Sequence, residues 1–171
     1  MSYLRIVGSD IIYPYSIAEL KQENSQTSFP KIMSSELLAN FGIHYVVETS
    51  PPTYDSINED LNEVIPTQID NVWTQQWVVS SASSEDIAVR LSNWRSTLVL
   101  TPRQANLILL YGGFLDEVET WIAGQSRQVQ IDWSKATEIR RDWPLINDAA
   151  TDLGFTEAQL DEFFVVGRTL Q

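Results

Sequence analysis

The first half of the chain carries short runs of apolar and β-branched residues, separated by polar and turn-forming residues. Such runs favour strands. Short helices are expected between them, because Ser16 and Glu19 have the spacing of a helix-capping box and because Gly42 is placed to end a second helical stretch. The expected strands cover residues 3–7, 11–15, 44–49 and 72–79, and the two expected helices cover residues 17–24 and 35–41.

Residues 50–68 form the least regular segment of the sequence. They contain three prolines and many acidic or amide side chains, a composition that is typical of loops. Proline also restricts the residue before it to extended conformations. The sequence therefore predicts a long loop here, with one helical turn at most.

From residue 83 onward the apolar residues recur at helical spacing. Ile87, Leu91 and Trp94 fall at positions i, i+4 and i+7, on one face of a helix. Thr101 and Thr156 each begin a Thr-x-x-Gln box, which predicts the start of a helix. Short helices are marginal in isolation, so they are expected to pack against one another. The expected helices cover residues 85–95, 102–111, 114–123, 128–142, 145–153 and 157–166.

These elements predict an α+β protein. A mixed module of helices and strands is expected over residues 1–98, and a compact helical subdomain over residues 99–171. The chain of 171 residues is long enough for both. No linker rich in glycine and serine separates them, so the two parts are expected to share a core.

The chain is strongly acidic, with 23 Asp and Glu against 11 Lys and Arg and a net charge of −12. The acidic residues are spread over both halves. Such a surface repels phosphate, which disfavours binding to nucleic acid or to an anionic membrane. The sequence shows no signal peptide and no apolar stretch long enough to span a bilayer, so a cytosolic site of synthesis is expected.

Few residues in the sequence suggest catalysis or metal binding. The chain has no cysteine and a single histidine, His44, without a recognisable nucleophile or orienting acid. Asn58, Asp60 and Asn62 alternate like the start of a calcium loop, but the glycine and the distant glutamate of that loop are missing. We therefore expect no enzyme, no cofactor and no metal. A glycosidase pair of carboxylates stays open, since its spacing is a property of the fold.

The aromatic residues are the best candidates for a binding surface. Six tryptophans are present, of which Trp133 and Trp143 are expected in the core. Trp73, Trp77 and Trp94 are either core residues or anchors of an interface, where tryptophan is enriched. Trp73 and Trp77 lie four residues apart and would share one face of a strand. The candidate binding residues are Trp73, Trp77, Tyr54 and Trp94.

Arg140 and Arg141 form the only doublet of adjacent basic residues. They lie near the end of the helix expected over residues 128–142, where cations are favourable. Asp132 and Glu138 lie on the same expected helix. A structural role in ion pairs is therefore expected for the doublet.

The first half of the chain resembles the amino-terminal module of small proteins that tailed bacteriophages encode beside their tail-fibre genes. In that family a Tyr-Ser run ends in Asn-Pro and is followed by Ser-Phe-Pro. Here Ser25 stands where the family often has proline. The order of helix, strand, loop and strand is also similar. The matching residues are Tyr15–Asn24, Thr27–Pro30, Glu36–Leu38, Gly42–Val46, Pro52–Asp55 and Val72–Val78.

The second half resembles another phage-tail piece that is often found downstream of such modules. Together the two resemblances cover most of the chain, and they mark phage tail regions without indicating a reaction. The matching residues are Thr101–Ala105, Gly113–Val118, Ile131–Trp133, Arg140–Asp142, Pro144–Leu145 and Leu160–Phe163.

The resemblance implies a non-catalytic protein that binds the tail-fibre polypeptide and stays in the virion as a part of the tail fibre. Contacts with a second copy or with neighbouring tail proteins are a further option. A second hypothesis is an assembly chaperone that binds unassembled fibre chains and is absent from the mature virion. A third is a glycan-active enzyme, and a fourth is an acidic mimic of DNA.

Overall fold

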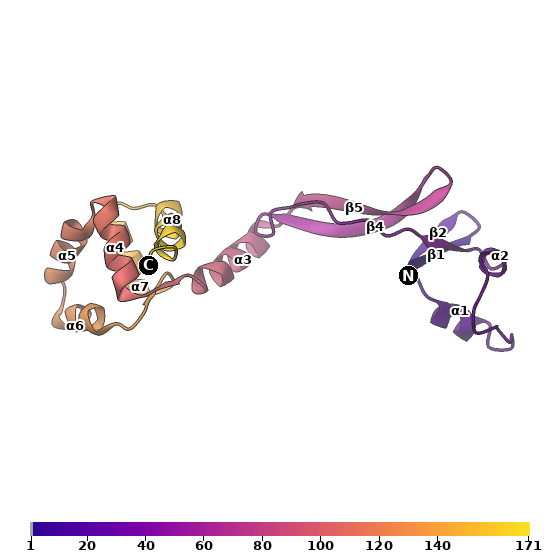
Figure 1. Ribbon diagram of the computed structural model, residues 1–171, viewed down its shortest axis with the longest axis horizontal. Coiled ribbons are helices and arrows are strands. Elements are labelled where there is room, and N and C mark those ends of the chain that lie inside the picture. The colour runs from indigo at the N-terminus through magenta and orange to yellow at the C-terminus, as the bar shows by residue number, and fades with distance from the viewer. Residues whose placement is uncertain (1) are drawn as a thin grey trace. The chain divides into compact units, whose positions relative to one another are not determined.

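The computed structural model describes residues 2–171 and combines helices with strands in an α+β fold (Figure 1). The chain separates into two compact units, which divide after Ala82. This division falls earlier than the boundary expected after residue 98. The reason is that helix α3 (Ser84–Ser96) belongs to the helical unit, where Trp94 packs against its core.

The first unit contains a small antiparallel sheet of three strands. Strands β1 (Ser2–Val7) and β2 (Asp10–Tyr15) form a hairpin, and β3 (Ile43–Val46) pairs with the other edge of β1. The strand order is therefore β2-β1-β3, and the three strands agree with the expected ones. Gly42 has a φ of +71°, and a Cβ at this position would lie only 2.4 Å from the carbonyl oxygen of Ile6. Glycine is required there both for the backbone conformation and for the space.

Two short helices complete the core of this sheet. Helix α1 (Ile17–Glu23) begins with the predicted capping box of Ser16 and Glu19, and α2 (Ser35–Ala39) is capped by Ser34. Their apolar side chains pack against the sheet and remove apolar surface from water. This core contains the buried residues Tyr15, Leu20, Leu38 and Ile43, with Tyr3, Ile17, Phe29, Met33 and Phe41 partly buried around them.

The first unit also contains a long β-hairpin, which corrects the loop expected over residues 50–68. Strand β4 (Glu59–Ile69) pairs antiparallel with β5 (Val72–Ser81) (Figure 1). Asp70 and Asn71 form the two-residue turn, and both have positive φ. Such a turn matches the twist of the strands it joins, and Asp and Asn tolerate its conformation. Pro66 fits into the strand at an irregularity of register between Val64 and Thr67.

The second unit is a compact group of helices. Its five helices after Thr101 correspond to the five that were expected, and the predicted capping boxes at Thr101 and Thr156 are both formed. Helices α4 and α8 pack closely together. The elements are α4 (Pro102–Gly112), α5 (Leu115–Ala123), α6 (Arg127–Lys135), α7 (Pro144–Asp152) and α8 (Glu157–Gly167).

The helix expected over residues 128–142 is too long. Helix α6 ends at Lys135, because Ala136 adopts an extended conformation with ψ of 133°. The chain then enters the short strand β7 (Ile139–Arg140), which pairs antiparallel with β6 (Val99–Leu100). This pairing buries Leu100 and Ile139 in the core of the unit. Tertiary packing therefore outweighs the helical pattern of the sequence at this point.

Each unit has its own apolar cluster, which corrects the expectation of a shared core. The cluster of the second unit is rich in aromatic side chains, and Trp133 and Trp143 pack against it as expected. Phe114, Phe155 and Phe163 meet edge to face, with ring centroids 4.8–5.6 Å apart. Such geometry adds to the stabilisation that burial provides.

A network of ion pairs lies against this core and is centred on Arg141, which is 1% exposed. Its guanidinium donates from Nε to Asp161 at 2.6 Å and from Nη2 to Glu157 at 2.6 Å. Arg95 of α3 donates to the same Asp161 carboxylate at 2.8 and 3.0 Å. Arg141 also donates to the amide oxygen of Asn147. The two arginines thus join α3, α7 and α8 through one buried carboxylate.

The two arginines of the doublet have different structural roles. Arg140 pairs with Asp142 and Glu138 at the surface, whereas Arg141 lies in the buried network. The expectation of structural ion pairs is confirmed for both residues. The partners Asp161 and Glu157 come from α8, and sequence spacing alone does not reveal them.

We expect Asp161→Asn to lower the free energy of unfolding of the second unit by about 3 kcal/mol, because it leaves the Arg141 and Arg95 guanidiniums without their shared anion. This value lies at the low end for a broken buried pair, since Glu157 stays in contact with both arginines. The matched control is Arg140→Ala, for which we expect about 1 kcal/mol or less. Urea denaturation of the two variants provides the comparison, and an equal effect of both would contradict a special role for the buried network.

Candidate functional site

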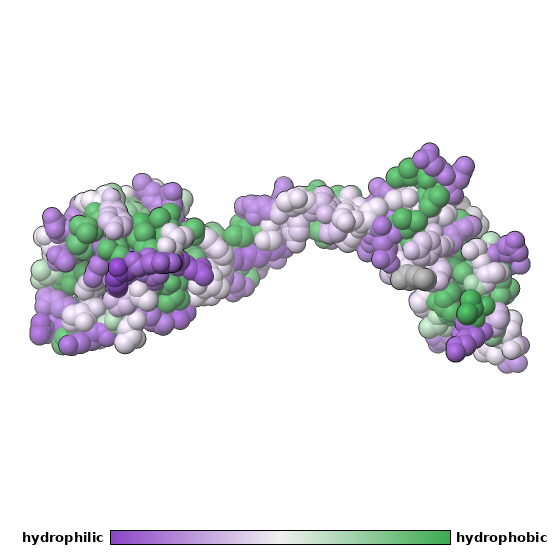
Figure 2. Space-filling view, in the orientation of Figure 1, coloured by the Kyte–Doolittle hydropathy of each residue, from purple (hydrophilic) through white to green (hydrophobic). Residues whose placement is uncertain are grey.

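The β4–β5 hairpin exposes apolar side chains that a two-stranded sheet has no means of covering. Ile69 and Val72 face each other beside the turn and are 51% and 46% exposed. Val78 is 46% exposed, and its neighbour Val79 points to the opposite face. Figure 2 shows apolar surface close to the turn of this hairpin. An accumulation of this kind on strands is a feature of interaction surfaces.

Trp73 and Trp77 lie on one face of β5, as the spacing predicted, and both are half-buried. The Trp73 ring lies 6.4 Å from the ring of His44, between centroids, and its Nε1 is buried without a hydrogen-bond partner among the described residues. Trp77 donates from Nε1 to the carbonyl oxygen of Thr49 at 3.4 Å. The two indoles therefore combine a structural contact with partly accessible apolar surface.

The segment after β3 holds the hairpin in place. The Val47 N–H donates to the carbonyl oxygen of Trp73 at 2.8 Å, and the Gln75 N–H donates to the carbonyl oxygen of Val47 at 2.9 Å. Thr49 adds two hydrogen bonds with Gln75. This short parallel bridge fixes the hairpin to the three-stranded sheet, because an isolated hairpin is only marginally stable in water.

Tyr13 of β2 connects the sheet to the hairpin a second time. Its hydroxyl donates to the carboxylate of Glu63 on β4, which also accepts from the side-chain amide of Gln75 at 2.6 Å. Burial, the hydrogen bond to Glu63 and the charge of Glu63 together raise the pKa of Tyr13 to about 12. The pKa of Tyr15 on the same strand is also raised, mainly by burial.

The other two candidate residues lie outside strand β5. Tyr54 lies in the loop before β4 and is 40% exposed. Trp94 belongs to the second unit and packs against its core, so a structural role accounts for this side chain. Of the four residues named from the sequence, the structure places Trp73 and Trp77 on one face of one strand.

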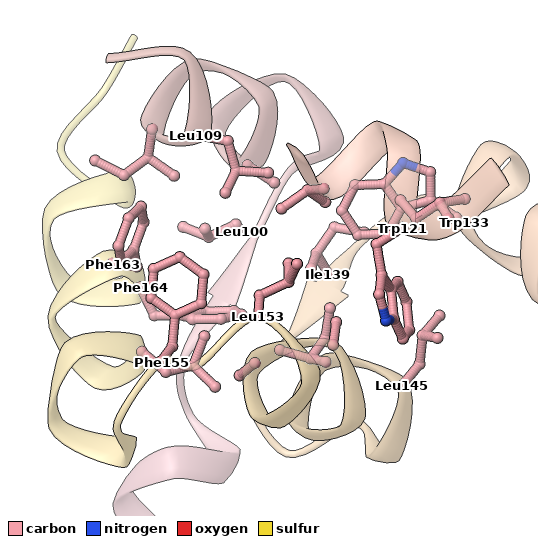
Figure 3. Close-up of a pocket in the computed structure, with 18 residues that line it drawn as sticks. Leu100, Leu109, Trp121, Trp133, Ile139, Leu145, Leu153, Phe155, Phe163 and Phe164 are labelled. Carbon is pink, nitrogen blue, oxygen red and sulfur yellow. The ribbon is translucent and has the colours of Figure 1, made fainter. Parts of the chain in front are cut away.

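The second unit contains an apolar pocket of about 80 Å³, lined by residues of helices α4 to α8 and of the β6–β7 pair. Figure 3 shows Trp121 and Trp133 on one side of it and Phe155, Phe163 and Phe164 on the other. Its lining is almost wholly apolar. With no convergent acid, base or nucleophile in the lining, this pocket has the character of core packing rather than of an active site.

The sequence did not reveal two features of the structure. The first is strand β4, which the proline and acidic residues concealed; the Asp70–Asn71 pair beside apolar residues is the signal that could have revealed the hairpin. The second is Trp121, which lines the pocket and donates to Asp152 at 2.9 Å. Its place in the apolar stripe of α5, beside Val118 and Ile122, could have indicated burial.

No protein-family model, curated protein or solved structure matches the chain. In residues 2–171 no three His, Asp or Glu side chains gather where they could hold a metal ion. Within the same residues, no helix combines the length and the apolar character that crossing a membrane requires.

We expect the first unit to lose stability as the pH rises from about 10 to about 12. The raised pKa means that folding favours the neutral phenol of Tyr13, so this contribution is fully present below the unfolded-state value of 10.0 and is lost as the pH approaches about 12. Tyr13→Phe should flatten the profile in part, since Tyr15 contributes in the same direction. Thermal unfolding at a series of alkaline pH values measures this effect. Tyr111→Phe, at an exposed position of the second unit, is the control, and identical profiles for wild type and Tyr13→Phe would contradict the expectation.

Proposed function

We propose that this protein is a non-catalytic phage tail-fibre-associated protein that binds the fibre polypeptide through its β4–β5 hairpin. The observation that carries the proposal is the pair of half-buried indoles, Trp73 and Trp77, on one face of β5, with Val72 and Val78 exposed on the other face. The resemblance of the sequence to proteins encoded beside tail-fibre genes supports the choice of partner. It includes residues Val72–Val78, which form most of strand β5.

The chemistry of the hairpin suits binding rather than catalysis. Interfaces take most of their affinity from a few aromatic anchors that become buried in the complex. Trp73 and Trp77 are positioned by the Val47 and Thr49 hydrogen bonds, so little conformational entropy is lost when a partner covers them. Val79 lies on the same face of β5 as the two indoles and supplies additional apolar area, whereas Ile69, Val72 and Val78 supply it on the opposite face.

The protein is proposed to stay on the particle as a component of the tail fibre. Quantitative mass spectrometry of purified virions tests this location directly. A copy number close to that of the fibre polypeptide is expected. Absence from virions, together with co-purification on unassembled fibre chains, would instead identify an assembly chaperone.

Trp73→Ala and Trp77→Ala are each expected to weaken binding to the fibre polypeptide by about 30-fold, the effect of losing a typical aromatic anchor worth about 2 kcal/mol. Ile69→Ala tests the opposite face of the hairpin, at an exposed residue whose side chain has no polar group to hold the hairpin in place. The measurement is a titration of each folded variant with purified fibre polypeptide.

The control for these variants is Tyr111→Ala, which removes an aromatic side chain that is 69% exposed in the second unit. Its affinity should equal that of the wild type. Circular dichroism confirms that each variant keeps its helices. Unchanged affinity in all three folded hairpin variants would remove the hairpin from the binding surface.

A further inference from the structure

The hairpin has an open backbone edge as well as exposed side chains. Because β4 and β5 form a sheet of two strands, each has one outer edge without a neighbouring strand in its own sheet. The bridge at Val47 occupies the outer edge of β5 only at Trp73 and Gln75. These two hydrogen bonds show that the odd-numbered residues of β5 direct their N–H and C=O groups outward. The same alternation directs the backbone groups of Trp77, Val79 and Ser81 outward, and among residues 2–171 none of these groups has a hydrogen-bond partner on this edge, while Thr49 contacts the Trp77 indole.

The two outer edges differ in their protection against another strand. Strand β4 carries Pro66, an irregular register between Val64 and Thr67, and the charged residues Glu59 and Glu63. Proline, bulges and charges are the usual means by which edge strands avoid pairing. In β5 the segment Trp77–Ser81 (WVVSS) has regular pairing with β4 and contains no proline and no charge. It is therefore the part of the hairpin that is open to strand addition.

The charges around this edge select the kind of partner. No Lys or Arg occurs between Lys31 and Arg90, so the whole hairpin lacks a cation. Three carboxylates lie on β4 directly opposite the open segment: Glu59 faces Ser81, Asp60 faces Ser80, and Glu63 faces Trp77. A second copy of this chain would bring an equally acidic hairpin against the edge, and like charges oppose such an approach. A segment that carries Lys or Arg is favoured instead.

We infer that the outer edge of β5 from Trp77 to Ser81 accepts an extended, basic polypeptide segment as an additional strand. Backbone hydrogen bonds to Trp77, Val79 and Ser81 would provide the pairing, and Val79 with Trp77 would contact apolar side chains of the added strand. The lysine or arginine side chains of the segment lie within the field of the β4 carboxylates. This inference deepens the proposed function: it rests on the hairpin as the binding surface and assigns the fibre segment a chemistry.

The test uses the full chain and two synthetic peptides with the same alternation of apolar and charged residues, one with lysine and the other with glutamate at the charged positions. Tryptophan fluorescence and calorimetry measure the binding. The wild type should bind the lysine peptide with an affinity that falls as salt is added, and should not bind the glutamate peptide. Val79→Pro should reduce the affinity for the lysine peptide about tenfold or more, because it removes an outward N–H without interrupting the ladder to β4.

Val79→Thr is the matched control, because threonine keeps the N–H and favours a strand, and its affinity should stay close to that of the wild type. Ser81→Pro removes a second outward N–H. It tests strand addition at this edge if Val79→Pro does not fold. The inference is overturned if the wild type fails to bind the lysine peptide, if both peptides bind equally, or if the folded proline variants bind like the wild type.

A parallel titration with the fibre polypeptide separates this inference from the proposed function. Binding of the lysine peptide at the edge without any binding of the fibre would leave the edge assignment standing and remove the fibre as its partner. Binding of the fibre that is insensitive to Val79→Pro would preserve the proposed function and overturn strand addition as its mode.

Discussion

A sheet of two strands has two faces and two edges, and it cannot bury all of them with its own residues. This constraint governs the β4–β5 hairpin. One edge of β5 is held by the hydrogen bonds of Val47, and one contact of β4 is supplied by Tyr13 through Glu63. The remaining surface, with Ile69, Val72 and Val78, stays exposed. Exposing this apolar surface to water lowers the stability of the hairpin in the isolated chain. The same surface makes the hairpin suitable for binding a partner.

The two units are stabilised in different ways. The first surrounds a three-stranded sheet with short capped helices, and its small core leaves the hairpin outside. The second unit closes its helices around aromatic side chains and adds a buried charge network at Arg141. Burying a guanidinium is unfavourable unless every donor is satisfied, so Asp161, Glu157 and Asn147 must occupy particular positions. This requirement restricts how α7 and α8 can pack.

The two units also differ in the surfaces that they offer to other molecules. The helical unit has an apolar pocket lined by no acid, base or nucleophile. The hairpin has backbone groups, apolar side chains and a uniform negative charge on one exposed element. This combination supports the proposed recognition of another polypeptide, and its charge opposes the approach of a second copy.

The sequence by itself determined the elements that depend on local interactions. The capping boxes at Ser16, Thr101 and Thr156 marked three helix starts, because a cap and its partner lie within one helical turn. It also determined the shared face of Trp73 and Trp77, since side chains alternate along a strand. Tertiary structure alone decided the end of α6, the pairing of β6 with β7 and the burial of Arg141. It likewise decided the open edge of β5, because each of these features depends on residues distant in the chain, whose proximity no local pattern encodes.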